Sequence, residues 1–257
     1  MKKLLLVCMV TVSATASRAA LLDDFESYST GNLGNVANPP WTSVLNPTSA
    51  NALIGEEVDG NGYFSYFAPT TTVVRGGSRG ITAINNTSAA STFFLRFFTE
   101  TDTFNHSFGL SANAAPTAFT DMNVMMRVNA GVFDVRDGAG FTTGVAIQSG
   151  TWYNVWAVIN QTSDTFDVYL NSGSADATVS DLVATGAAFR VATTSSLTSF
   201  VALVQGFTGA PAANKVRLDD LYQFDGVYLA NPTAVPEPTT IAILALGLGG
   251  LLLKRKK

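Results

Sequence analysis

Acidic side chains gather near both ends of the central part of the chain. Asp23, Asp24 and Glu26 stand near its start, and Asp219 and Asp220 near its end. If the two segments that carry them pair as strands, these carboxylates meet at one sheet edge, and Ca²⁺ prefers such oxygen-rich groups. Asp24 and Asp220 are the first candidates for a structural, non-catalytic Ca²⁺, and no other cofactor is expected. Ordinary strand alternation, with the acids in water, is the alternative that we favour.

The histidine and cysteine content argues against several kinds of catalysis. His106 is the only histidine and would have to act as the base of a Ser-His-Asp triad, but Asn105-His106-Ser107 lies in an expected strand. We interpret it as a core or sheet-face residue. A zinc site built from several His or Cys ligands is excluded by their number. Cys8, the only cysteine, lies in a segment that we expect to be removed, so thiol catalysis is excluded and no catalytic residue is predicted.

Aromatic side chains are the candidates for binding a sugar. Trp152 and Trp156 stand four residues apart and therefore share one face of a strand, while Tyr153 takes the other face. Trp152, Trp156 and Tyr169 could stack on sugar rings. Packing in the core is the default alternative for such residues.

Short β-rich runs separated by Gly, Asn, Asp, Ser and Thr are the elements that must position these residues. Alternation predicts strands, because successive side chains then point to opposite faces. Phe166, Val168 and Leu170 alternate with polar residues, as in a strand with one buried face. The four polar residues 161–164 predict a hairpin between 152–160 and 165–170. The strands expected are 63–68, 71–75, 92–98, 105–110, 123–128, 131–135, 152–160, 165–170, 200–205 and 215–224.

Three segments resemble one known architecture. Residues 150–158 (Gly-Thr-Trp-Tyr-Asn-Val-Trp-Ala-Val) and 166–171 (Phe-Asp-Val-Tyr-Leu-Asn) look like the central hairpin of LamG-like, concanavalin A-like jelly rolls. Residues 22–28 and 216–222 look like the first and last strands of such domains, which are neighbours in that fold. The resemblance implies an all-β, two-sheet jelly-roll sandwich over residues 20–230.

Glu57 and Asp59 are similar to part of the Glu-x-Asp-x-x-Glu strand of laminarinase-like hydrolases of that fold. The resemblance implies a nucleophile and a helper, but Gly60, Asn61 and Gly62 follow where the acid/base glutamate is expected. A retaining glycosidase needs two carboxylates for these roles. We therefore expect no enzyme, and a glycan-active enzyme, either hydrolase or lyase-like, is the alternative.

The end of the chain has three parts in a fixed order. A Pro-Glu-Pro turn is followed by an apolar run and then by four cations. This order resembles the PEP-CTERM sorting signal of Gram-negative bacteria, whose carriers are processed by a membrane enzyme called exosortase. It implies a linker and motif at 231–238, a transmembrane helix at 239–253 and a cytoplasmic basic tail at 254–257. The residues of the motif are Val235, Pro236, Glu237 and Pro238, and those of the basic stop are Lys254, Arg255, Lys256 and Lys257.

The start of the chain is typical of a secretory signal peptide at residues 1–19, which addresses it to the secretion translocon. Residues 20–238 keep eight of the 15 cations and all 19 acids, for a net charge of −11. Such a domain repels nucleic acid, which is excluded as a partner. We expect a membrane-anchored precursor, then a non-catalytic β-sandwich in the cell envelope, on the surface or in the extracellular matrix. Polysaccharide is its candidate ligand.

Overall fold

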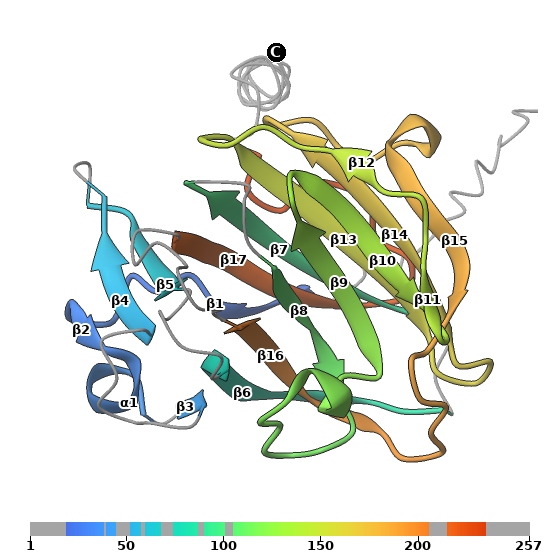
Figure 1. Ribbon diagram of the computed structural model, residues 1–257, viewed down its shortest axis with the longest axis horizontal. Coiled ribbons are helices and arrows are strands. Elements are labelled where there is room, and N and C mark those ends of the chain that lie inside the picture. Colours follow the sequence, from blue (N-terminus) through green and yellow to red (C-terminus); the bar gives the residue numbers. More distant parts are fainter. Residues whose placement is uncertain are drawn as a thin grey trace, which may run out of the picture.

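Two antiparallel sheets packed face to face form the protein (Figure 1). The computed structural model describes residues 19–38, 40–44, 52–57, 60–67, 74–86, 90–100, 105–205 and 215–234. The predicted signal peptide, apart from its last residue, lies outside the described residues, and so do Val235–Pro238 and the predicted transmembrane helix and basic tail. Within the described ranges, no helix is long and apolar enough to span a membrane.

The first sheet, sheet A, has nine strands, in the order β15-β14-β13-β7-β17-β5-β4-β2, with β1 also paired to β17. β5 pairs with the first half of β17 and β1 with the second half, and a bulge separates the two halves. The strands are β1 (Ala19–Asp23), β2 (Gly31–Asn32), β4 (Ala52–Glu56), β5 (Gly62–Phe67), β7 (Ser91–Thr99), β13 (Trp152–Asn160), β14 (Thr165–Ser172), β15 (Leu182–Ala188) and β17 (Lys215–Asp225).

The second sheet, sheet B, has eight strands, in the order β11-β10-β9-β8-β16-β6-β3, with β12 paired to β10. Its strands are β3 (Trp41–Val44), β6 (Val74–Ile84), β8 (His106–Ser111), β9 (Val124–Asn129), β10 (Val132–Asp137), β11 (Gly140–Phe141), β12 (Val145–Ala146) and β16 (Leu197–Gln205). The helices described are short: α1 (Leu33–Val36) and the 3₁₀ turns η1 (Phe119–Asp121) and η2 (Val179–Asp181).

The main core lies between the two sheets and is rich in phenylalanine. Phe97 of β7 stacks on Phe133 of β10 at 5.8 Å between ring centroids, and Phe93 stacks on Phe200 of β16 at 5.2 Å. Alternate residues of each strand point into this core, so the residues between them point away from it. This alternation decides which side chains of β7, β13 and β17 can meet a ligand.

Several sequence predictions are confirmed. β13 and β14 form the predicted hairpin, with Asn160 opposite Thr165. β1 pairs with β17, so the first and last strands are neighbours, as the concanavalin A-like resemblance implied. Tyr153 points into the core, where it stacks on Phe97 at 5.5 Å, and Trp156 lies on the opposite face of the strand.

Other elements were missed or placed differently. No strand was predicted for β3, β4 or β15, and β6 extends far beyond the predicted run 71–75, of which 71–73 lies outside the described residues. Gly76, Gly77 and Gly80 stand in β6, and glycine weakens the sequence signal of a strand. A Cβ at Gly76 would lie 1.9 Å from the carbonyl oxygen of Ala202 on β16. Glycine therefore permits the close approach of these two strands.

The segment after β17, Gly226–Ala234, packs on the outer face of sheet A. We call it the C-terminal strap. Tyr228 stacks on Phe224 at 4.0 Å, and the indole Nε1 of Trp156 donates a hydrogen bond of 3.1 Å to the carbonyl of Ala230. Asn231 is buried, and its backbone N–H donates to Asp176 at 2.8 Å. Residues 231–234, predicted as part of a linker, thus belong to the packed domain.

Candidate binding site

The candidate site lies on the face of sheet A that points away from the core. The strand register places Trp152 of β13 opposite Phe98 of β7, which in turn lies opposite Arg217 of β17. In the neighbouring row, Asn154 of β13 lies opposite Arg96 of β7. Since alternate residues of β7 and β13 fill the core, these side chains all project outward.

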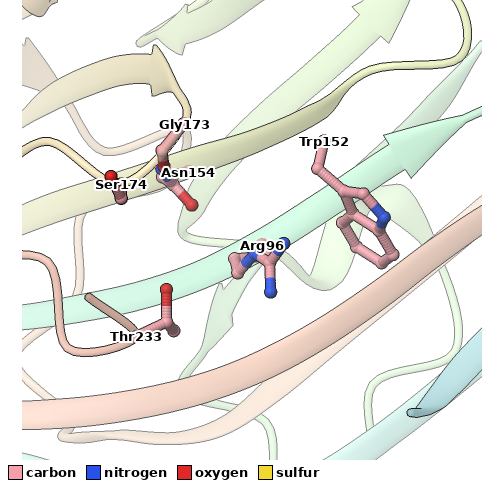
Figure 2. Close-up of a pocket in the computed structure, with 6 residues that line it drawn as sticks. All are labelled: Arg96, Trp152, Asn154, Gly173, Ser174 and Thr233. Atoms are coloured by element: carbon pink, nitrogen blue, oxygen red, sulfur yellow. The ribbon is translucent and has the colours of Figure 1, made fainter. Parts of the chain in front are cut away.

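A hollow of about 250 Å³ opens among these outward side chains and is bordered by the C-terminal strap. In Figure 2, Arg96 lies between the indole of Trp152 and a group formed by Asn154, Ser174 and Thr233. We call this hollow the Arg96 pocket. It is lined by Arg96, Trp152, Asn154, Gly173, Ser174 and Thr233.

Contacts between neighbours fix the pocket's side chains. The Arg96 guanidinium carbon lies 4.9 Å from the centre of the Trp152 ring, and its Nη1 is 2.9 Å from Oδ2 of Asp220. The amide Nδ2 of Asn154 donates to the carbonyl oxygen of Gly173 at 2.7 Å and to Oδ1 of Asn171 at 3.0 Å. The pocket thus contains the guanidinium of Arg96, fixed by its ion pair, the amide of Asn154 and the half-buried indole of Trp152. The two polar groups can bind hydroxyl groups, and the indole can pack against the apolar face of a sugar.

The bulge in β17 explains why Asp220 reaches Arg96. Asp220 has φ +52°, a left-handed conformation that Asp tolerates better than most residues. Its neighbour Asp219 is 1% exposed and accepts hydrogen bonds from the N–H of Asp220 at 2.7 Å and from Asn61 at 3.0 Å. Burial, and next the negative charge of Asp220, raise the pKa of Asp219 to about 7.

The predicted calcium ligands have other contacts. Asp220 forms an ion pair with Arg96, and Oδ1 of Asp24 accepts the backbone N–H of Glu26 at 3.2 Å. Burial, and then the charges of Asp220 and Asp24, raise the pKa of the Tyr222 hydroxyl, so the two carboxylates do act on a common neighbour. In the part of the chain that the structure describes, no group of three or more His, Cys, Asp or Glu residues could hold a metal. The structural Ca²⁺ stays a prediction.

The three predicted ligand-binding aromatics do not share one site. Trp152 lines the Arg96 pocket and is half-buried. Trp156 is fully buried beneath the C-terminal strap, against Phe94 at 5.0 Å, and does not line this pocket. Tyr169, opposite Trp156 in the register, packs against the same outer cluster. The spacing of the two tryptophans correctly predicted that they share one face of the strand. It could not show that the C-terminal strap covers Trp156.

Glu57 and His106, which were also considered for catalysis, are held by neighbouring side chains. Oε1 of Glu57 is 2.6 Å from Nη1 of Arg217, and Asp59 lies outside the described residues. His106 is fully buried among aromatic rings, with its Nδ1 3.4 Å from the Tyr66 hydroxyl, and burial lowers its pKa to about 3. It therefore stays neutral at physiological pH, as expected of a core histidine.

Sequence reasoning missed Arg96 and Thr233. The signal for Arg96 was present, since it is the single charge in the phenylalanine-rich strand Ser-Thr-Phe-Phe-Leu-Arg-Phe-Phe-Thr. No local pattern could indicate Thr233, because its place depends on the fold of the strap. The same holds for the partner of Arg96, Asp220, which was considered only as a metal ligand.

Solved structures share this fold at low sequence identity. The catalytic domain of a glycoside hydrolase family 131 protein from Coprinopsis cinerea matches with a TM-score of 0.52 and 12% identity, over 75% of this chain and 86% of that one. A sialidase matches with a TM-score of 0.51 and 13% identity, over 78% of this chain but only 18% of its own length. The lectin UEA-II, solved with galactose, matches with a TM-score of 0.49 and 10% identity, over 83% and 99% of the two chains. At these identities the likeness shows the fold alone, and it agrees with the expected all-β sandwich of two sheets.

Comparison of the sequence alone identifies the end of the chain. No curated protein sequence matches the chain. Residues 234–256 match the PEP-CTERM protein-sorting motif, which begins at the last described residue of the C-terminal strap. This motif marks an exported surface protein and implies processing by an exosortase. The chain is thus a two-sheet β-sandwich that carries a PEP-CTERM protein-sorting motif.

Proposed function

We propose that this protein is a non-catalytic surface or matrix protein that binds polysaccharide through the Arg96 pocket. The observation that carries the proposal is the guanidinium of Arg96, held 4.9 Å from the Trp152 ring and ion-paired to Asp220, inside a hollow of about 250 Å³. A half-buried indole with fixed polar groups beside it suits a sugar, which has an apolar face and a rim of hydroxyls. The sorting motif supports a place of action outside the cytoplasm, where such polymers are found.

The lining of the pocket argues against glycoside hydrolysis there. Both standard mechanisms need two carboxylates that flank the bond, about 5 Å apart in retaining enzymes and about 6.5–9.5 Å apart in inverting ones. None of the six lining residues is an acid. Asp220, the nearest carboxylate to Arg96, is engaged by it at 2.9 Å.

One observation favours the alternative, a glycan-active enzyme. The pKa of Asp219 is raised to about 7, and a carboxyl with such a pKa can act as a general acid near neutral pH. Its 1% exposure and its two hydrogen bonds argue for a structural role instead. If the alternative holds, the protein releases reducing ends from a polysaccharide, and Asp219→Asn abolishes the release.

The test of the binding function is a glycan array probed with full-length protein in mild detergent, followed by titration of a hit. Trp152→Ala should weaken binding at least tenfold, about 1.4 kcal/mol, because it removes the stacking face. The matched control is Phe141→Ala on sheet B, which removes a ring that also stacks with arginines, Arg127 at 3.4 Å and Arg136 at 4.9 Å. No binding to any glycan, or equal affinity of wild type and Trp152→Ala, overturns the proposal.

A further inference from the structure

Half-buried aromatic rings and guanidinium groups continue beyond the Arg96 pocket, across the outer face of sheet A. Phe98 lies next to Trp152 with ring centroids 5.5 Å apart. The guanidinium of Arg217 follows, 4.8 Å from the Phe98 ring and 4.8 Å from the Tyr63 ring. The row thus runs over four adjacent strands, β13, β7, β17 and β5. We call Phe98, Arg217 and Tyr63 the aromatic strip.

The strand register makes the strip continuous with the pocket. Trp152, Phe98 and Arg217 are direct register partners across β13, β7 and β17, and Arg217 is in turn opposite Ser65 of β5. Strands of a sheet lie about 4.8 Å apart, so three spacings from β13 to β5 give a length of about 14 Å. A ligand confined to the pocket would leave this length unused.

Each guanidinium of the row already has a carboxylate partner. Arg96 pairs with Asp220 at 2.9 Å, while Arg217 pairs with Glu57 at 2.6 Å and with Glu100 at 2.8 Å. The row therefore carries no excess of positive charge, in a domain whose net charge is −11 over residues 20–238. Such a surface repels a polyanion, whereas its paired donors and acceptors can still bind neutral hydroxyls.

We propose that the aromatic strip extends the Arg96 pocket, so that the ligand is an uncharged polysaccharide bound in an extended conformation over several sugar units. Trp152 contacts the units in the pocket, and Phe98 and Tyr63 contact units further along the chain. Arg217 positions these two rings, because its guanidinium lies 4.8 Å from the centre of each. This inference rests on the proposed sugar-binding function of the pocket and deepens it.

The test compares short with long sugars by calorimetry on full-length protein in detergent. The probes are neutral di- and hexasaccharides of β-glucan, xylan and mannan, and the hexasaccharide of polygalacturonate as the acidic counterpart. We expect a neutral hexasaccharide to bind at least tenfold more tightly than its disaccharide. Raising the salt concentration from 50 to 300 mM, which shortens the Debye length about twofold, should hardly change this affinity. Preference for the acidic probe, or equal affinity for the two lengths, overturns the inference.

Two variants separate the strip from the pocket. Tyr63→Ala should weaken hexasaccharide binding about tenfold and leave disaccharide binding unchanged, while Trp152→Ala weakens both. Gly55→Ala is a second probe, since its Cβ would lie 2.6 Å from Cζ of Tyr63 and must displace that ring. Phe141→Ala is again the control, and melting curves verify that each variant folds.

The outcomes tell the two proposals apart. If Trp152→Ala weakens binding and neither Tyr63→Ala nor Gly55→Ala affects the hexasaccharide, the strip has no role and the pocket alone binds. If no probe binds, or if Trp152→Ala has no effect on any of them, the proposed function itself is refuted.

Discussion

Replacing Arg79 with methionine tests whether a buried ion pair holds the first strand to sheet B. Nη1 of Arg79 on β6 is 2.5 Å from Oδ2 of Asp23 on β1, and the two side chains are only 10% and 4% exposed. The same carboxylate accepts hydrogen bonds from Nε1 of Trp41 at 2.6 Å, the Tyr28 hydroxyl at 2.9 Å and the N–H of Phe25 at 3.0 Å. Asp23, which the sequence placed among acids that could meet at a sheet edge, is therefore fully engaged in holding the fold.

The magnitude follows from what Arg79→Met leaves behind. Methionine keeps most of the side-chain volume but leaves the carboxylate of Asp23 buried without a cation. Breaking a buried pair in this way costs about 3–5 kcal/mol, whereas an exposed pair is worth about 1 kcal/mol or less. The variant also loses the donor to the carbonyl of Leu22, so we expect a loss at the upper end of that range.

The assay is urea unfolding of full-length protein in nonionic detergent, followed by tryptophan fluorescence. Asp23→Asn and the double variant complete a cycle. The double variant has no unpaired buried charge. Its loss in free energy of unfolding should therefore be about 2 kcal/mol smaller than the sum of the losses of the two single variants. A loss below about 1 kcal/mol for Arg79→Met, or additive losses, would refute the buried-pair reasoning.

Three further predictions concern single buried residues. Because the pKa of Asp219 is raised to about 7, its own contribution to stability is greatest below about pH 4 and falls by up to about 4 kcal/mol as the pH rises through 7. Asp219→Asn should remove this loss, and an unchanged pH profile of the urea midpoint would contradict it. The pKa of His106, lowered to about 3, has the opposite effect, because the contribution of this residue to stability falls as the pH falls below 6.5. Wild type should therefore lose stability relative to His106→Phe on acidification, and parallel acid titrations of the two would contradict this. Gly109→Ala places a Cβ 1.9 Å from the carbonyl oxygen of Val124 and should cost more than about 3 kcal/mol, whereas Gly80→Ala, with open space around it, should melt within a few degrees of wild type.

Alternation predicted those strands in which core and surface residues differ in kind. β14 alternates Phe166, Val168 and Leu170 with polar residues, and all three are buried. Most of β6 and all of β15 were missed because small residues, glycine and alanine above all, do not show which face of a strand is buried. Their pairing comes from neighbouring strands, which a local pattern does not contain.

The site was predicted only in part for a similar reason. Trp152 could be found because a large aromatic on the outer face of a strand is conspicuous. Its partner Arg96 is defined by a register that joins β7 to β13 on one side and to β17 on the other. The bulge that turns Asp220 toward Arg96 is a tertiary feature, since it lies where β17 changes its partner from β5 to β1.

The C-terminal strap decides which aromatic residues remain accessible. The outer cluster of Phe94, Trp156 and Phe224 would be an exposed apolar surface if the chain left the domain directly after β17. Tyr228 and Leu229 cover it instead, and the N–H of Ala177 donates to the carbonyl of Leu229 at 2.8 Å. The strap ends at the border of the Arg96 pocket, which Thr233 lines, and its last residue, Ala234, is the first residue of the sorting motif. The same nine residues that bury Trp156 therefore also border the pocket in which Trp152 stays half-buried, and they include the first residue of the sorting motif.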